Sequence, residues 1–260
     1  MSWSLAAPLI IVGGALVIIA LERRLPYDRQ RLLRDGLVAD LIGYALIQSA
    51  VLSVVIGSVV GLIDHATGAS SAVGGHGLVS RWPFAAQVAL FVVSHDFYIY
   101  WFHRWQHANP WLWRLHEAHH SAREVDWIAG SRSHALEIVI NQTIEVAAMV
   151  LLGASTDVML CKGAISVVSG MWIHANVDLS PIFGDRLRWL RFVANSPALH
   201  RWHHAIDYKP PGKNFGTKLS LWDHLFGTAD LPAHKPAGYG LTDPFPRGFL
   251  AQQAHAFRRE

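Results

Sequence analysis

The segment DFYIYWFHRWQHANPWLWRLHEAHH, residues 96–120, carries two closely spaced histidine clusters. The first is H-x-x-x-H and consists of His103 and His107. The second is H-x-x-H-H and consists of His116, His119 and His120. Residues three and four apart lie on one face of a helix, so each cluster predicts a chelating surface. Imidazole surfaces of this kind suit zinc, copper, iron or nickel.

A third cluster repeats the spacing of the second in residues 200–204. Its members are His200, His203 and His204, and a leucine precedes each H-x-x-H-H, at 115 and at 199. Three such surfaces offer more ligands than one tetrahedral ion accepts. The sequence therefore predicts a two-metal site.

The composition indicates a membrane protein. The chain is 52% hydrophobic and 16% charged, with eleven tryptophans and a mean hydropathy of +0.24; soluble proteins are roughly 25% charged. Although the isoelectric point is near 9.2, the sequence carries no nucleic-acid-binding motif, and basic cytoplasmic loops explain such a value equally well. Cys161 is the one cysteine, which excludes intrachain disulfides and cysteine-ligated iron–sulfur clusters. Any metal must be held mainly by nitrogen and oxygen.

Five apolar segments predict membrane helices at residues 5–21, 37–63, 83–107, 135–153 and 154–174, the last two being the weakest. The first could instead be a signal peptide, but no basic region precedes it and Arg23 and Arg24 follow it, which favours a retained span. We therefore expect an all-α, integral-membrane helical bundle of about four to five membrane helices, with a cytoplasmic helical cap that carries the histidines.

We expect a single membrane domain over residues 1–260. It divides into N-terminal membrane helices (1–82), a catalytic region (83–228) and a C-terminal tail (229–260). The loop after the first span holds five arginines within residues 23–34, whereas residues 64–82 hold only Arg81. The positive-inside rule then places the first loop in the cytoplasm and the N-terminus outside. The third predicted helix then runs towards the cytoplasm, and the fourth and fifth together return the chain to the same side. All the clustered histidines are therefore expected on the cytoplasmic face.

Two further histidines lie at helix ends on that face and could complete the ligand set. His134 precedes the fourth predicted helix, and His174 ends the fifth. The predicted metal ligands are thus His103, His107, His116, His119, His120, His134, His174, His200, His203 and His204. Side chains expected to orient these imidazoles are Asp96, Glu137, Asn176 and Asp223; for Asp223, structural packing is an equally good explanation. His95 lies eight residues before His103, about 12 Å along a helix, and is predicted to line a substrate cavity.

Two other functions fit parts of this pattern. His116-Glu117-x-x-His120 matches the H-E-x-x-H motif of zinc proteases, in which the glutamate is the general base. Arg201 stands at the equivalent place in the third cluster, which favours an incidental Glu117. A metal transporter is the second alternative, but transport needs polar groups near the middle of the membrane, whereas these histidines cluster at one end.

The motifs that carry a family resemblance are Asp96-Phe97…Trp101-Phe102-His103-Arg104-x-x-His107, Trp113-x-x-His116-x-x-His119-His120-Ser121, Pro197-x-x-His200-x-x-His203-His204, and Asn214-Phe215-Gly216…Trp222-Asp223-x-x-Phe226-Gly227-Thr228. In these residues, over roughly 83–228, the chain resembles the fatty acid hydroxylase/sterol desaturase superfamily of integral-membrane di-iron oxygenases.

The resemblance implies two iron ions as cofactors, O2 as co-substrate and a lipid as substrate. The expected reaction is hydroxylation of a fatty acyl, sterol or related lipid, with desaturation as the alternative. Each cycle needs two electrons, and the chain has no G-x-G-x-x-G fingerprint and no cysteine cluster. A separate ferredoxin or cytochrome b5-type reductase system is therefore the expected protein partner, and no nucleic acid is expected.

Overall fold

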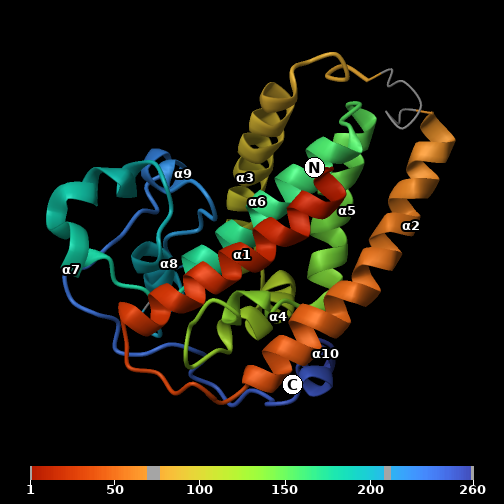
Figure 1. Cartoon of the computed structure of the whole chain (residues 1–260). Helices are drawn as coiled ribbons and strands as arrows, with labels where there is room; N and C mark the ends of the chain where they lie inside the picture. The colour runs from red at the N-terminus through yellow and green to blue at the C-terminus, as the bar shows by residue number, and fades with distance from the viewer. Residues whose placement is uncertain (1, 69–76, 208–211, 259–260) are drawn as a thin grey trace.

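The computed structural model describes residues 2–68, 77–207 and 212–258. Within these ranges the chain is helical, with two isolated β-bridges and no strand. Five long helical stretches form a bundle (Figure 1): α1 (Trp3–Arg24), the π-helix η1 (Ala39–Gln48) continuing into α2 (Ser49–Thr67), α3 (Phe84–Ala108), α5 (Ala135–Leu151) and α6 (Thr156–His174). In this bundle α1 packs along α6, α2 packs along α5, and α3 packs against α6.

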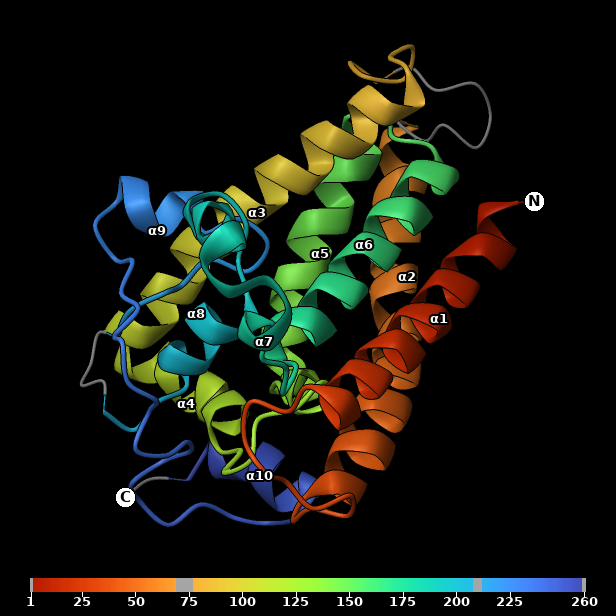
Figure 2. The ribbon, with the colours of Figure 1, turned by 60° about the vertical axis from the view of Figure 1, so that its left-hand side comes forward.

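The shorter elements cover the end of the bundle where α3 turns into α4, and part of one side (Figure 2). They are α4 (Pro110–His120), η3 (Ala129–Ser131), α7 (Ser180–Phe183), η4 (Gly184–Phe192), α8 (Pro197–His203), α9 (Leu221–Leu225) and α10 (Phe249–His255). α4 packs against α3, and α8 packs against α6, so the histidine-bearing elements are neighbours.

The outer faces of the bundle are suited to lipid. Three helical stretches of the described chain are long and apolar enough to cross a membrane, namely 3–24, 39–67 and 156–174. Their outward side chains are aliphatic and exposed, for example Leu16 at 63% and Leu62 at 69%. The predicted fold class, an all-α membrane bundle, is confirmed. By length and composition three of its five long stretches qualify as spans, while α3 and α5 carry more polar side chains.

A buried charge network ties the membrane helices to the segment beneath the histidines. Asp40, at the start of η1, is fully buried and pairs with Arg34 at 2.7 Å and with Arg132. Arg34 also pairs with Asp126 at 2.7 Å. Because a buried charge is tolerated only when it is paired, this network fixes the segment from Asp126 to Arg132 against the bundle.

Candidate metal centre

The turn between α3 and α4 folds the second histidine cluster back onto the first. The side-chain oxygen of Asn109 accepts hydrogen bonds from the backbone N–H groups of Trp111 at 2.9 Å and Leu112 at 3.1 Å, so Asn109 caps α4. Pro110 occupies the first helical position, where no backbone donor is needed. α4 therefore starts at a sharp reversal and runs back against α3.

The third cluster is placed by the same kind of start signal. The Ser196 hydroxyl accepts from the Leu199 N–H at 3.4 Å, and Pro197 takes the first position of α8. His174 is the last residue of α6, which packs against α8. Two helix starts and one helix end thus bring residues more than 90 positions apart into one site.

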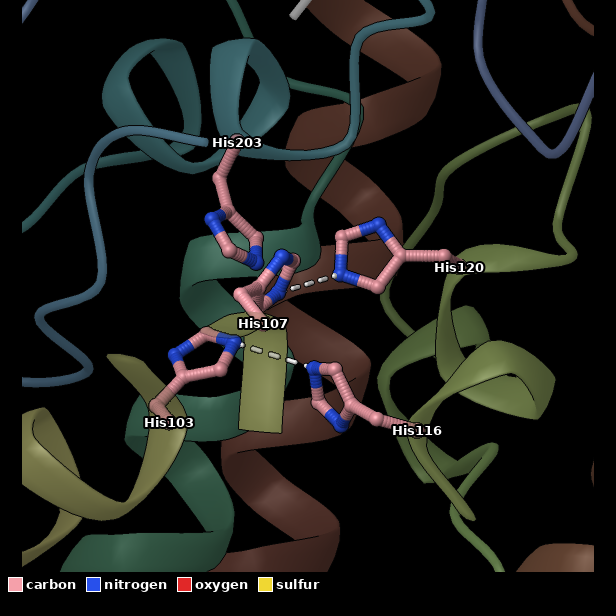
Figure 3. A group of neighbouring side chains, drawn as sticks. All are labelled: His103, His107, His116, His120 and His203. Atoms are coloured by element: carbon pink, nitrogen blue, oxygen red, sulfur yellow. Dashed lines mark hydrogen bonds between the residues drawn. The ribbon is translucent and has the colours of Figure 1, made fainter. Parts of the chain in front are cut away.

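The side chains form two groups. The five-histidine group, shown in Figure 3, consists of His103, His107, His116, His120 and His203. The four-histidine group consists of His119, His174, His200 and His204. In each group the candidate ligand nitrogens lie within 4.8 Å of one another. The groups adjoin, since the ring centroids of His120 and His204 are 4.5 Å apart.

Hydrogen bonds fix where the protons lie in the four-histidine group. His119 Nδ1 is 2.8 Å from the Arg132 carbonyl oxygen, and His174 Nδ1 is 2.8 Å from the Gly170 carbonyl oxygen. A carbonyl only accepts, so both Nδ1 atoms carry the proton, and each neutral ring presents a bare lone pair at Nε2. These two Nε2 atoms lie 3.2 Å apart. Two lone pairs at this distance repel each other unless a cation lies beside both.

The five-histidine group has the same electronic arrangement. His103 Nδ1 donates to the Phe215 carbonyl at 2.8 Å, and His116 Nδ1 donates to Glu137 Oε1 at 3.1 Å. Their Nε2 atoms are 3.0 Å apart, along one of the dashed lines in Figure 3. His203 Nδ1 donates to the Lys213 carbonyl at 2.8 Å, and its buried Nε2 has no partner in the described part of the chain. Lone pairs therefore converge here as well.

Burial keeps these rings neutral. Desolvation is the largest cause that lowers the pKa of His116, His119 and His120 on α4 and of His200, His203 and His204 beside them. An extra proton, which would turn a lone-pair contact into a hydrogen bond, is therefore disfavoured. Neutral imidazole is also the form that binds metal.

The spacing of the nitrogens suits shared ions. In the four-histidine group the Nε2 atoms of His174, His200 and His204 form a triangle with sides of 3.0, 3.2 and 3.2 Å. Ligand nitrogens about 2.0–2.1 Å from one ion lie about 2.8–3.4 Å apart at bond angles of about 90–110°. The donors present thus fit two imidazole-bound transition-metal ions, one at each group.

Glu137 contacts a ring of the five-histidine group directly. Its Oε1 accepts from His116 Nδ1, while its Oε2 is buried without a hydrogen-bond partner among the described residues. A carboxylate in this position holds the tautomer and makes the imidazole a better ligand.

Asp96 and Asp223 bind the backbone of the loop that follows α8, and this loop in turn contacts the imidazoles. Asp223 accepts from the Phe215 N–H at 2.7 Å and the Gly216 N–H at 2.8 Å, while Asp96 accepts from the Lys218 N–H at 2.8 Å. This loop presents the carbonyls of residues 213 and 215 to His203 and His103. The two carboxylates therefore orient imidazoles through the backbone.

Among the described residues, the side chain of Asn176 forms hydrogen bonds with Asp28 and Arg201 and with no imidazole of either group. Arg201, which was not among the predicted site residues, explains its place. Arg201 is fully buried on α8, where it lies between His200 and His203 in the sequence. Its guanidinium donates to Asn176 Oδ1 at 3.1 Å and to the Val125 carbonyl at 2.7 Å. In the sequence, the feature that could have indicated this role is an arginine flanked by His200 and His203 on one short helix. Together Arg201 and Asn176 fix α8 against the end of α6.

The structure does not bring His134 into either group. Its Nδ1 accepts from the Leu136 N–H at 3.1 Å, so it caps α5, and its Nε2 donates to the Gln253 carbonyl at 2.9 Å. Both ring nitrogens are thus occupied by the protein. An imidazole before a helix looks the same in sequence whether it caps that helix or binds metal.

Two cavities reach the histidines from different sides and share no lining residue. The inner cavity, of about 230 Å³, extends between α3, α5 and α6 and touches five of the nine rings. His95 lines it, as does Lys218. The outer cavity, of about 320 Å³, touches His107, His120, His203 and His204 and is also lined by residues 240–245 and His255.

Comparison with known proteins identifies the family. The sequence profile of the family described as fatty acid hydroxylase matches residues 88–228. Ornithine lipid hydroxylase OlsE of Rhizobium tropici is 33% identical over 258 residues, which cover 96% of this chain and 76% of that protein. No solved structure matches the chain.

More distant relatives share the central region. Alkylglycerol monooxygenase of Homo sapiens is 29% identical over 57% of this chain and 32% of its own length. Fatty acid hydroxylase vlmA of Lecanicillium sp is 26% identical over 55% of this chain and 42% of its own length. These relatives are named as lipid hydroxylases or monooxygenases, so the superfamily resemblance is confirmed. With its apolar helices and converging histidines, the chain belongs to the fatty acid hydroxylase family of membrane oxidoreductases.

Proposed function

We propose that this protein is an O2-dependent lipid hydroxylase whose two histidine groups hold two iron ions. The observation that carries the proposal is the convergence of bare Nε2 lone pairs at 3.0–3.2 Å in both groups. Such an arrangement is stable only around cations. Relatives named as lipid hydroxylases supply the reaction class.

The five-histidine group would hold one ion and the four-histidine group the other. Iron bound there would supply the redox chemistry that activates O2 towards a C–H bond. The balanced reaction converts R–H, O2, two electrons and two protons into R–OH and water. His134 is left out of the proposed ligand set because the protein occupies both of its nitrogens.

The surrounding residues hold the ligands still and exclude water. Backbone carbonyls and Glu137 keep at least five rings in the Nδ1–H tautomer, so that Nε2 stays free. The Phe215 ring packs against His103, His107 and His203 at centroid distances of 5.3–5.7 Å. A dry, preorganised site protects a reactive oxidant from side reactions with solvent.

We further propose that the histidine end faces the cytoplasm and receives electrons from a separate protein. The arginines at residues 23–31 flank this end, as the positive-inside rule requires of a multi-pass chain. An acidic ferredoxin or cytochrome b5-type donor would dock on the same basic surface. Steep loss of the reduction rate with rising salt is expected; a rate independent of salt with every donor would contradict this docking.

The function is tested by mass spectrometry of membrane lipids from cells with and without the protein. The expected product is a lipid that gains one oxygen. His119→Ala and His203→Ala, one from each group, should abolish it and lower bound iron, whereas His65→Ala, at an exposed position on α2, should change neither.

A product that has lost two hydrogens would instead assign desaturation at the same centre. Full turnover by His119→Ala loaded with metal would refute the proposed ligands. The absence of any oxidised lipid in cells that contain the iron-loaded protein would refute the proposed function.

A further inference from the structure

Trp113 on α4 packs an indole ring directly against the five-histidine group. The centroid of its ring lies 5.0 Å from that of His107 and 5.2 Å from that of His120, and His116 is a third neighbour at 6.3 Å. Among the described residues, the aromatic side chains other than histidine that pack on this group are Trp113 and Phe215. Indole gives up an electron much more readily than phenyl or imidazole. Of these rings, Trp113 is therefore the one that is readily oxidised.

The same indole also faces the solvent side of the centre. Trp113 is partly exposed and lines the outer cavity, which touches His107 and His120 as well. Thr242 and Asp243 also line this cavity and are exposed, so the cavity communicates with solvent. Trp113 is therefore placed to pass an electron to the ligand rings on one side and to exchange a proton and an electron with the solvent on the other.

A second tryptophan on the same helix provides a comparison. Trp111, two residues earlier on α4, is 76% exposed, and the described part of the chain shows no ring contact between it and either histidine group. The two tryptophans of α4 thus share a helix and a side-chain type but differ in contact with the proposed ligands. Any property that belongs to Trp113 alone must come from that contact.

A centre that activates O2 needs an outlet for oxidising equivalents when no lipid is bound. Hydroxylation uses two electrons from the donor and two from the C–H bond. Without that bond, complete reduction of O2 to two waters needs four electrons and four protons, so two further electrons must come from elsewhere. The imidazoles are the groups nearest to the ions, and their oxidation would destroy the site. Excluding such competing reactions is the task of the surrounding protein.

We propose that Trp113 supplies these electrons to the five-histidine group and so protects the imidazoles during turnover without lipid. In each of two steps the indole loses one electron to the oxidant formed from O2 and loses its N–H proton to solvent through the outer cavity. An external one-electron donor of the ferredoxin or cytochrome b5 class then returns the electron, and solvent returns the proton. Summed over the cycle, the donor supplies all four electrons and Trp113 is unchanged. This inference rests on the proposed O2-dependent function and adds a protective residue to it.

The test follows Trp113 under conditions that prevent its repair. The full-length, iron-loaded protein receives two electrons per molecule from dithionite, then excess O2 and no lipid, and its peptides are analysed by mass spectrometry. Trp113 is expected to gain oxygen, because an oxidised indole that is not reduced again adds oxygen from O2 or water. Trp111, although more exposed, should gain far less. The metal-free protein should gain oxygen at neither residue.

The outcomes separate this inference from the proposed function. Equal oxidation of the two tryptophans, or oxygen on His107 or His120 with Trp113 intact, would overturn the inference. Uptake of O2 by the iron-loaded protein with Trp113 unmodified would do the same and leave lipid hydroxylation standing. A protein that neither takes up O2 nor oxidises any lipid when loaded with iron would refute the proposed function, and this inference with it.

Variants separate electron donation from packing. During lipid-free turnover with excess donor, Trp113→Phe should lose iron several-fold faster than the wild type, counted per iron bound at the start, and oxygen should appear on His107 or His120. Trp113→Tyr keeps an oxidisable ring and should restore most of the protection, which a purely structural role would not predict. Trp111→Phe is the matched control and should behave as the wild type. Equal inactivation of the two phenylalanine variants, or Trp113→Tyr as fragile as Trp113→Phe at equal iron content, would overturn the assignment.

Discussion

Gly130 touches the four-histidine group so closely that one added methyl group should displace a ligand. A Cβ at this position would lie 2.5 Å from His174 Nδ1 and 2.8 Å from its Cγ. Gly130 lies in η3 without a positive φ, so alanine meets no backbone strain there. Any effect of Gly130→Ala must therefore come from the contact with the imidazole.

The displacement follows from these distances. Ordinary contacts of a Cβ begin at 3.4 Å, so the ring must retreat by about 1 Å. It cannot do so freely, because Nδ1 donates to the Gly170 carbonyl at 2.8 Å and Nε2 lies 3.0 Å from His200 Nε2. Overpacking of this kind costs about 1–3 kcal/mol, and metal sites tolerate misplacement of only about 0.5 Å. We expect metal affinity at the four-histidine group to fall about 10- to 100-fold.

The assay is a metal titration of the purified protein, with bound iron counted by elemental analysis. Gly130→Ala should retain the ion at the five-histidine group and lose the other at metal concentrations that fill both sites in the wild type. Gly163→Ala is the control, since a Cβ there meets nothing within 4 Å. Two ions bound to Gly130→Ala with unchanged affinity would refute the placement of His174 as a ligand. A similar loss in Gly163→Ala would show that the effect is not local.

Three further predictions concern the carboxylates and His134. Glu137→Leu should weaken metal binding about 10- to 100-fold, whereas Glu137→Gln should weaken it less because it keeps an acceptor for His116 Nδ1. Equal losses of metal affinity in the titration would show that this hydrogen bond is irrelevant. Glu117→Gln should leave O2 uptake and lipid product largely intact, since Glu117 lines the outer cavity with its Oε2 3.8 Å from His255 Nε2. Loss of activity would revive the protease alternative. His134→Asn should keep both metals, and because asparagine also caps helices, only the hydrogen bond to Gln253 should be lost, at about 1 kcal/mol of stability. Loss of a metal would return His134 to the ligand set.

The helices and the histidine clusters could be predicted because both depend on local patterns. Apolar runs predicted the five long stretches, and the start of α4 also depends on a local pattern, the Asn109-Pro110 pair. The number of histidine clusters predicted a two-metal site, and the structure places His116 and His120 in one group and His119 in the other. In these cases the spacing within a helix determines which face a side chain occupies.

The partners of the imidazoles could not be predicted in this way. Four of the five atoms that fix the Nδ1–H tautomers are backbone carbonyl oxygens, of residues 132, 170, 213 and 215. A carbonyl is present at every residue, so no side-chain pattern marks the ones that are used. The partner of His134 Nε2 is also a backbone carbonyl, that of Gln253, so the sequence could not distinguish His134 from a ligand. Asp96 was expected to orient an imidazole, whereas the structure shows it bound to the backbone of the loop after α8.

The loop after α8 shows why the centre depends on the whole fold and not on the histidine clusters alone. Asn214 adopts a left-handed conformation, with φ of 58°, between the carbonyls of residues 213 and 215. Asparagine tolerates this region better than most residues, and its side chain donates to the Leu199 and Asp230 carbonyls. The turn points one carbonyl at His203 and the other at His103, which come from α8 and α3. Asp223 and Asp96 then hold the backbone that follows. The C-terminal Asn-Phe-Gly…Trp-Asp motif thus sets two imidazole tautomers, and a chain with the histidines but without this loop would lose the two acceptors that keep the protons of His103 and His203 on Nδ1.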